Sequence, residues 1–418
     1  MSFEIALSGI NAINSQLDTI SNNIANSGTY GFKSSRANFA SVYAGTQPTG
    51  TEISSLSQSL NIGGGVLTTG RSLDVSITGG GFFVTKDASG AEVYSRVGVF
   101  SKDQDGYIVD TFNRKVQGYQ QVFDADGKPV EGALGALGNL KVSTGQIPAQ
   151  ASTSLTYVGN MSVDWDVKTA AFDSTDPKTF NSSSLSVVYD SLGVQHTVNQ
   201  YYVKTATNEV TVHFSMDGAA LAGTTALGFS TKGRLATIDG VAPTAPTPLP
   251  ANWAPVFPAK ALNLGTPSGA NPMTIGIDYN GVTQYSGPAT TTTNTSDGYA
   301  AGAFSGVEID ADGSVVAQYS NGKKIAVGTL ALATFPNEDG LVAISNTSWT
   351  TSNASGLPLY STPGIGLAGS LTPGSLEQSN VDMTSELVDL MSAQRNYQAN
   401  TKVISAQDEM MQTLMQAV

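Results

Sequence analysis

The sequence predicts a mixed, mainly β protein whose two ends are α-helices. Apolar residues recur every three or four positions at both ends, and short β-type stretches separated by turn residues fill the middle. The chain also has 45 Gly and 17 Pro among its 418 residues, and only 13% of its residues are charged, against roughly a quarter in a typical globular protein. This composition suits short strands and many turns, and the length indicates two or three domains.

The first 25 residues carry apolar side chains at alternating spacings of three and four. This heptad pattern is typical of a helix that offers one narrow stripe to a partner helix. Asn26-Ser27-Gly28 predicts the end of the helix, with Gly28 in the left-handed conformation. Several asparagines lower the helix propensity, so we expect a helix that is marginal until it packs. The stripe consists of Phe3, Ala6, Ile10, Ile13, Leu17, Ile20 and Ile24.

The other end predicts a longer helix with the same alternation. Ser379 and Asp382 resemble a capping box, and the helix would then run to the last residue over about 55–60 Å. Polar residues interrupt the stripe, so its packing should be less apolar than that of an ideal zipper. The stripe consists of Met383, Leu387, Leu390, Gln394, Tyr397, Thr401, Ile404, Asp408, Met411, Met415 and Val418.

Both stripes must be buried against a partner, and the seams alone leave two possibilities open. The helices can form a hairpin that packs on the chain's own core, or they can pair as a coiled coil with helices of other copies in a polymer. Because everything between them is β-rich and offers no obvious wide face for narrow helices to cover, we favour the intermolecular pairing.

The middle of the chain predicts hairpins. Residues 79–119 contain several strands, with turns at Ser89-Gly90 and Asp105-Gly106. The stretch that begins at Asp103, DQDGYIVDTFNRKV, is echoed by DADGSVVAQYSNGKKI from Asp310. We interpret the echo as two halves of one sheet-rich domain, so the segment between the halves is an inserted domain.

The inserted domain is expected over about residues 148–295. Its alternating segments predict strands at Ser184–Tyr189, Gln195–Val203 and Glu209–Phe214. A Pro-rich stretch from Ala242 to Pro258 and a Thr run from Thr290 to Asp297 both resemble loops.

Composition also excludes several classes of function. The formal net charge is −13 and no basic face is visible, so binding to nucleic acid or to an anionic membrane is not expected. The chain has no cysteine, which excludes disulfides and thiolate metal sites. The N-terminus lacks the marks of a signal peptide, and the longest apolar run, from Ile325 to Phe335, is about half of what spans a bilayer.

Residues that carry enzyme chemistry are scarce. The only histidines are His196 and His213, and no carboxylate accompanies them at a familiar metal-site spacing. Histidines that lie in strands with ordinary hydrogen-bond partners are therefore favoured over a metal-binding pair. The D-x-D-G stretches at Asp103, Asp124 and Asp310 lack the later ligands of a calcium loop and are interpreted as hairpin turns. We therefore expect no catalytic, cofactor-binding or metal-binding residues.

Both ends carry extended motifs. SGINAINSQLDTISNNIANSGTYGFKSSR, from Ser8, and SLEQSNVDMTSELVDLMSAQRNYQANTKVISAQDEMMQTL, from Ser375, resemble the terminal signatures of the flagellar rod, hook and hook-associated proteins. LDVSITGGGFFV, YSRVGVFSKDQDGYIV and LALATFPNEDGL are similar to their β-rich core domain. The residues that match the family motifs are Asn22, Asn23, Ile24, Ala25, Asn26, Gly31, Phe32, Lys33, Gln394, Arg395, Tyr397, Ala399 and Asn400.

The resemblance implies a structural role and no enzymatic one. Within the family, the length and the inserted domain favour a subunit of the hook, a hollow curved tube that acts as a universal joint between motor and filament. The resemblance further implies export through the flagellar type III apparatus without a cleaved signal peptide, a place outside the cell, and no cofactor. Implied partners are other copies of the chain, distal rod, hook cap and hook–filament junction proteins, and the export apparatus, with no membrane insertion.

The resemblance also divides the chain. It implies a terminal coiled-coil domain (1–30 with 375–418), a linker between subunits (31–70), a β-rich core domain (71–147 with 296–374) and the inserted outer β domain (148–295). The expected contacts between subunits are Ile10, Ile13, Leu17, Ile20, Ile24, Leu387, Leu390, Tyr397, Ile404 and Met411.

Two alternatives remain at this point. One is a distal rod or hook–filament junction subunit of the same family. The other is a secreted β-rich adhesin or binding module, which would suit the strands and the Thr- and Pro-rich segments but would leave the paired terminal helices unexplained.

Overall fold

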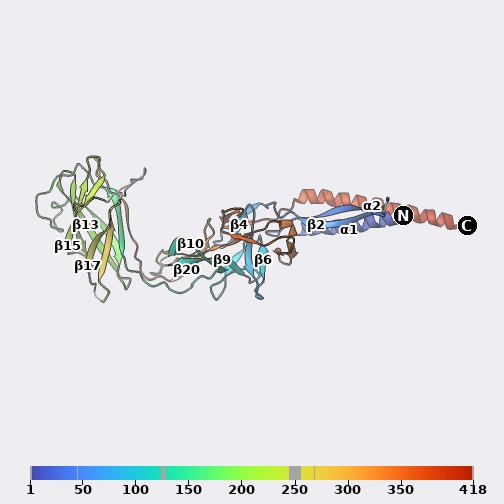
Figure 1. The fold of residues 1–418 in the computed structure, drawn as a ribbon, viewed down its shortest axis with the longest axis horizontal. Helices are drawn as coiled ribbons and strands as arrows, with labels where there is room; N and C mark the ends of the chain where they lie inside the picture. The colour runs from blue at the N-terminus through green and yellow to red at the C-terminus, as the bar shows by residue number, and fades with distance from the viewer. Residues whose placement is uncertain (1, 45, 124–128, 244–255, 268, 417–418) are drawn as a thin grey trace. The chain divides into compact units, whose positions relative to one another are not determined.

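The computed structural model describes residues 2–44, 46–123, 129–243, 256–267 and 269–416 (Figure 1). It confirms a mainly β chain with one long helix at each end. The chain forms two compact units. The first comprises Met1–Thr144, Ser305–Gln318 and Lys324–Val418, and the second comprises Gly145–Phe304 with Tyr319–Lys323. The inserted domain that we predicted at 148–295 falls inside the second unit.

The two terminal helices, α1 (Ser2–Ala25) and α2 (Met383–Gln416), pack against each other within the chain (Figure 1). At 34 residues, α2 is about 51 Å long. Its N-cap is Asp382, whose side chain accepts hydrogen bonds from the amides of Thr384 (2.9 Å) and Ser385 (3.3 Å). The predicted capping box with Ser379 in that role is therefore wrong, because the helix begins three residues later and Asp is an equally good cap.

The chain leaves α1 differently from the prediction. Gly28 does not adopt a positive φ, and the left-handed residue is Gly31, at φ 66°. The turn is closed earlier by side chains, since Asn26 donates its amide to the carbonyl and to the side-chain oxygen of Asn22. Asparagine can therefore satisfy this helix end without a left-handed glycine.

A two-stranded hairpin follows α1. Its strands, β1 (Ser35–Ala44) and β2 (Gln47–Gln58), pair antiparallel and pack along α1. The hydroxyl of Ser8 accepts a hydrogen bond from the amide of Thr51 at 3.2 Å, and a Cβ added at Gly50 would lie only 2.0 Å from that hydroxyl oxygen. Most of the segment that we expected to link subunits (31–70) thus has a regular conformation, which the sequence pattern did not predict.

The rest of the first unit is built on a 13-stranded sheet and two small two-stranded sheets. One face of the main sheet packs a core that contains Phe82, Tyr94, Phe335 and Trp349. One turn of 3-10 helix, η1, spans Glu338–Gly340. The strands are β3 (Val66–Thr68), β4 (Val75–Thr78), β5 (Phe82–Lys86), β6 (Glu92–Ser95), β7 (Phe100–Lys102), β8 (Ile108–Asp110), β9 (Lys115–Phe123), β10 (Pro129–Asn139), β20 (Phe304–Ile309), β21 (Ser314–Tyr319), β22 (Lys324–Leu330), β23 (Leu332–Thr334), β24 (Val342–Ile344), β25 (Ser348–Thr350), β26 (Leu359–Ser361), β27 (Ser370–Pro373) and β28 (Ser375–Glu377).

The sequence echo corresponds to strands of this one sheet. The turns at Asp103 and Asp310 each close a hairpin through a hydrogen bond that the amide of Gly106 or Gly313 donates to the aspartate backbone carbonyl. The strands that follow meet directly, because β22 pairs antiparallel with β9. The interpretation of two halves in one sheet is confirmed, and so are the turns at Ser89-Gly90 and Asp105-Gly106. The third D-x-D-G stretch, at Asp124, lies outside the described residues.

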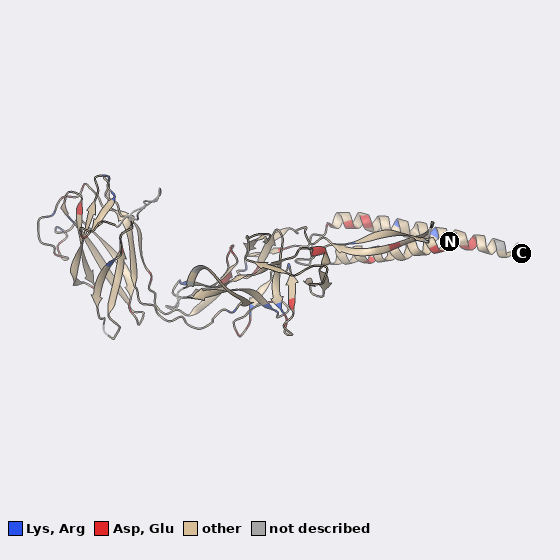
Figure 2. Cartoon of the chain, viewed as in Figure 1, with Lys and Arg blue, Asp and Glu red and all other residues tan. Residues whose placement is uncertain are grey.

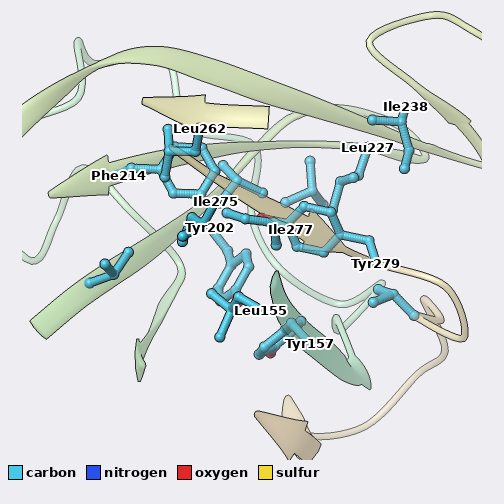
Figure 3. Close-up of a cluster of buried hydrophobic side chains, with 14 of the residues drawn as sticks. Leu155, Tyr157, Tyr202, Phe214, Leu227, Ile238, Leu262, Ile275, Ile277 and Tyr279 are labelled. Carbon is cyan, nitrogen blue, oxygen red and sulfur yellow. The ribbon is translucent and has the colours of Figure 1, made fainter. Parts of the chain in front are cut away.

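The second unit is a sandwich of a five-stranded and a four-stranded sheet, whose facing sides share one core (Figure 3). Phe214 and Leu227 come from the first sheet, and Leu155, Ile275 and Ile277 come from the second. The five-stranded sheet contains β12 (Ser182–Tyr189), β13 (Gln195–Ala206), β14 (Glu209–Met216), β15 (Ala219–Phe229) and β16 (Leu235–Ile238), and the four-stranded sheet contains β17 (Lys260–Gly265), β18 (Met273–Asp278), β11 (Ser154–Asn160) and β19 (Thr290–Ser296).

The three predicted strands of this unit are confirmed as β12, β13 and β14. The Thr run is a strand, β19, and not the loop that we predicted. It pairs antiparallel with β11 from Leu155–Ser296 to Asn160–Thr290. The β-branched Thr side chains suit an extended edge strand, even though few of them are apolar. Most of the Pro-rich stretch, residues 244–255, lies outside the described residues.

Candidate functional site

The base of the helix pair is organised around one buried carboxylate. Glu377 ends β28, the strand that directly precedes α2 in the chain, and its side chain is 1% exposed. Its Oε1 lies 2.7 Å from the Lys33 Nζ and accepts the Gly64 amide at 3.0 Å. Its Oε2 lies 3.4 Å from Nη1 of Arg96, which is equally buried. One anion therefore joins both ends of the chain to the core sheet.

The two cations have further partners. Lys33 donates to the carbonyl of Ile62 at 2.6 Å, and Arg96 donates to the carbonyl of Gly79 at 2.9 Å while its guanidinium stacks over the Phe82 ring. Among the described residues, Nε of Arg96 has no partner. Burial lowers the pKa of Lys33, and the Glu377 carboxylate opposes that shift. Two buried cations thus depend on one carboxylate.

Backbone bonds extend this cluster across both chain ends. The Gly31 amide donates to the carbonyl of Glu377 at 2.8 Å, and a Cβ at Gly31 would lie 3.0 Å from the backbone of Arg96. Together with its φ of 66°, this close approach requires glycine. Asn380 accepts the Ser34 amide at 2.7 Å and donates to the carbonyls of Ser59 and Ile62. The motif Gly31-Phe32-Lys33 is therefore part of a junction and not a free linker.

Asn23 links α1 to both neighbouring elements. It is 1% exposed, accepts the Ser35 amide at 2.9 Å and donates to the Ser35 carbonyl at 2.8 Å. It also donates to the Glu386 carboxylate of α2 at 2.8 Å. Burial raises the pKa of Glu386, with a contribution from the nearby carboxylates of Asp382 and Asp389. One asparagine thus fixes where the hairpin and the second helix leave the first.

The helices meet through small and apolar side chains. Ile13, Ile20 and Ala393 form the buried centre, with Leu17, Ile24 and Leu390 packed around it. Further along, a Cβ added at Gly9 would lie 3.0 Å from the side-chain nitrogen of Asn400. The pairing within the chain is the helical hairpin and not the intermolecular pairing that we favoured from the sequence, and it leaves part of α2 uncovered.

Every second residue of α2 that faces α1 lies one position before the predicted residue, as Ala393 lies before Gln394. Leu390 and Ile404 are partly buried as predicted, whereas Leu387 is 46% exposed. Small residues allow the two helices to approach closely, and polar residues can form side-chain hydrogen bonds between them. A prediction from hydrophobicity alone therefore selected residues adjacent to those that face α1. The partly or fully buried positions are Glu386, Leu390, Ala393, Asn400, Ile404 and Gln407.

The other predicted contact residues divide into two groups. Ile10 is partly buried, whereas Tyr397 and Met411 are exposed. The C-terminal motif is mostly exposed too, at Gln394, Arg395 and Ala399, and only Asn400 packs toward α1. Charges are sparse on α1, which carries only Glu4 and Asp18, whereas α2 carries charges of both signs (Figure 2). In the N-terminal motif Asn22 and Ala25 are exposed, whereas Asn26 and Phe32 are partly buried.

The two histidines have separate surroundings. His196 lies between the carboxylates of Asp217 (2.7 Å) and Asp190 (3.5 Å), and His213 stacks on Phe172 with ring centroids 4.1 Å apart. Within the described ranges, no group of three or more His, Cys, Asp or Glu residues is arranged to hold a metal ion. None of the helices described here is long and apolar enough to cross a membrane.

Family models match the chain in four consecutive parts. The model described as the flagellar basal body rod protein covers residues 3–33, and that of the flagellar hook protein FlgE/F/G D1 domain covers 76–163. The flagellar basal body protein FlaE D2 domain covers 160–299, and the flagellar basal body rod FlgEFG C-terminal model covers 372–417. The junction described above draws Lys33, Arg96 and Glu377 from the matches at 3–33, 76–163 and 372–417, respectively.

Whole proteins match over the same length. The chain is similar to the flagellar hook protein FlgE of Salmonella typhimurium, with 36% identity over 99% of each chain. The corresponding protein of Escherichia coli is 34% identical, again over 99% of each chain. The chain belongs to the flagellar hook protein family. This hook subunit also shares its fold with the Helicobacter pylori flagellar hook protein FlgE2, at a TM-score of 0.52 and 12% identity over 75% of this chain and 100% of that one.

The full-length match favours the hook subunit over the rod, junction and adhesin alternatives, and it identifies a structural protein of the flagellar hook. Sequence reasoning missed several residues of its junction, namely Arg96, Glu377, Asn380 and Glu386. All four lie inside the stretches that resemble the family, but none belongs to an apolar period, and only their contacts single them out.

Proposed function

We propose that this hook subunit polymerises into a hollow curved tube that transmits motor torque to the filament as a universal joint. The apolar face that α2 leaves uncovered carries the proposal. After α1 has been packed, Leu387, Val388 and Met391 remain 46%, 52% and 50% exposed on one side of α2. Met411, which continues the stripe that faces α1, is 54% exposed. A helix normally covers such a face, and other copies of the same helix pair are the partners that a polymer supplies.

In this proposal the helix pair forms the inner part of the tube. Contacts between copies use the predicted positions that are exposed, Leu387, Tyr397 and Met411, while Ile13, Leu17, Ile20, Ile24 and Leu390 hold the pair itself together. Ile10 and Ile404 contribute at the pair's border. The β1–β2 hairpin, in the segment 31–70, bridges neighbouring copies, and the core domain and inserted domain form the outer layers.

The proposal extends to the path and the partners of the chain. It is exported through the flagellar type III apparatus without a cleaved signal peptide and assembles outside the cell, between the distal rod and the hook–filament junction proteins, under a hook cap protein. It binds neither nucleic acid nor a cofactor, does not insert into a membrane and has no catalytic activity.

Electron microscopy of the purified chain under polymerising conditions tests the proposal. Hollow tubes are the expected result. A chain that stays monomeric under every condition in which a related hook protein forms tubes would contradict it.

A further inference from the structure

The core sheet ends in two short strands with open edges. Strand pairing gives the order β26-β23-β5-β6-β25-β24 across this part of the sheet. Within the described residues, β26 pairs only with β23 and β24 only with β25. Each outermost strand therefore presents unpaired backbone groups, an arrangement that soluble proteins usually protect with charges, bulges or covering segments.

Both edge strands have only three residues, which limits uncontrolled pairing, but neither strand carries a charge. The outer strand β24 has the sequence Val-Ala-Ile, in which Val342 is 50% and Ile344 41% exposed. At the other edge Leu357 is 84% and Leu359 56% exposed. Pro358 removes one donor, but it precedes β26 itself. The two edges are thus uncharged, apolar and accessible.

The exposed apolar side chains of both edges lie on the same face of the sheet. Successive cross-strand residue pairs lead from Ala343 to Tyr360, so these two side chains both lie on the core face. Val342, Ile344 and Leu359 are each one residue away in the same strands and therefore lie on the opposite face. The connecting pairs are Ala343–Trp349, Trp349–Tyr94, Tyr94–Val84, Phe82–Ala333 and Ala333–Tyr360.

We propose that β24 of one copy pairs with β26 of the next copy, so that their core sheets continue edge to edge. This inference rests on the proposed self-assembly. A second copy is the occupant because one chain supplies both edges, with apolar side chains on the same face. Once the strands pair, those side chains become cross-strand neighbours.

The contact would be head-to-tail, which leaves one edge free on each terminal copy and therefore extends a polymer instead of closing a dimer. On the core-facing side of β24, Ala343 lines two grooves of about 420 and 220 Å³, whose other walls include residues of α1 and of the β1–β2 hairpin. An incoming strand would border these grooves on that side and meet apolar side chains on the other.

Cysteine cross-linking tests the pairing directly, because the chain has no cysteine of its own. Two full-length double variants, Ile344→Cys/Leu359→Cys and Val342→Cys/Leu359→Cys, cover the two same-face positions of β24. After oxidation of assembled material, we expect at least one of them to give a ladder of disulfide-linked multimers. Each single variant should stay monomeric on a denaturing gel, and a mixture of single variants should give dimers only.

The matched control is Ile344→Cys/Leu192→Cys, whose second cysteine replaces a residue that is 61% exposed in the other unit. Cross-linking of this control as efficient as that of the double variants would overturn the inference. So would double variants that assemble into tubes without forming a ladder. If the unmodified chain forms no tubes, the proposed function itself is contradicted. If tubes form and only the ladder is missing, the strand pairing alone is wrong.

Charge variants provide a second readout. Ile344→Lys/Leu359→Lys places like charges on both edges and should reduce tube yield at least tenfold, whereas Ile344→Lys/Leu359→Glu should restore most of it. Equal yields from the two variants, each with the circular dichroism of the folded chain, would contradict the pairing.

Discussion

Lys33 and Glu377 are separated by 344 positions in the sequence and form a 2.7 Å ion pair that is almost completely buried. Arg96 contacts the second oxygen of the same carboxylate. The pair lies where the helix pair is attached to the core domain. The proposed joint would need a stiff attachment at this place, and a buried, hydrogen-bonded cluster provides a defined geometry.

The first prediction concerns this cluster. Glu377→Gln should destabilise the monomer by about 3–5 kcal/mol, because it leaves the Lys33 and Arg96 charges buried without a counter-charge. Urea unfolding measures the change. The control is Glu308→Gln, which breaks a more exposed pair with Lys324 and should cost about 0–1 kcal/mol. Similar losses of unfolding free energy in the two variants would mean that the buried Glu377 cluster stabilises the chain no more than an exposed ion pair does.

The second prediction separates contacts within the helix pair from contacts between copies. Ile13→Asp places a charge in the buried centre of the pair and should loosen both helices at a cost of several kcal/mol. Leu387→Asp changes an exposed residue, so the monomer should keep its helicity by circular dichroism while tubes disappear. Asn396→Asp is the control, because Asn396 is exposed and lies nine residues beyond Leu387, on the opposite side of α2, and it should leave both unchanged. Normal tubes from Leu387→Asp would exclude this face from assembly.

The sequence predicted the elements whose residues repeat with a regular period. The apolar heptads located both helices, and alternation located β12 to β14. The β1–β2 hairpin was missed because its residues are largely Ser, Thr and small side chains, whose strand conformation depends on packing against α1, as between Ser8 and Thr51. The Thr run at β19 was missed for the same reason, since polarity outweighed β-branching in the interpretation.

The junction could be predicted only in part. The resemblance placed Asn23, Gly31 and Lys33 among the important residues, but it gave no partner for any of them. Those partners lie far away in the chain, and no local pattern relates Lys33 to Glu377 or Asn23 to Glu386. On α2, the choice of Ala393 and Asn400 over more apolar neighbours depends on how closely Gly9 and Ile13 let the helices approach.

The third prediction is a pH dependence in the second unit. Although burial alone would lower the pKa of His196, the hydrogen bonds that its ring donates to the Asp217 and Asp190 carboxylates raise it above its ordinary value of 6.5. The Thr197 amide and His196 lower the pKa of Asp217 below 3.8. The histidine's contribution to stability is therefore complete below pH 6.5 and is lost as the pH rises through its raised folded-state pKa.

Thermal or urea unfolding of the wild type and of His196→Gln, between about pH 5.5 and about pH 8.5, measures this effect. The advantage of the wild type should shrink by at most about 1 kcal/mol, because Asp217 is half exposed. His213→Gln is the control. Burial lowers the pKa of His213, so folding favours its neutral form, and the advantage of the wild type over this variant should grow as the pH rises. Parallel pH profiles for the wild type and His196→Gln would contradict the prediction.

The last prediction concerns how a tube can resist twisting and still bend. As a curved joint turns, each row of subunits must shorten on the inside of the bend and lengthen on the outside. Contacts at small radius change little, whereas contacts at large radius must slide. We expect the helix pair to provide the fixed contacts and the inserted domain to provide the sliding ones, since small polar contacts and bridging waters exchange partners easily.

Removing the inserted domain tests this division. The backbone of Ile147 and Gly302 is joined by two hydrogen bonds, of 2.9 and 3.2 Å, so residues 148–301 can be replaced by a short Gly/Ser linker between neighbouring ends. The shortened chain should still form tubes, because the helices and the core sheet are intact. Electron micrographs should show straighter tubes than those of the full chain, because the contacts that select a curved form are absent. If the shortened chain keeps the circular dichroism of a folded core and yet fails to polymerise, the inserted domain is needed for assembly itself, and its assignment to sliding contacts is wrong.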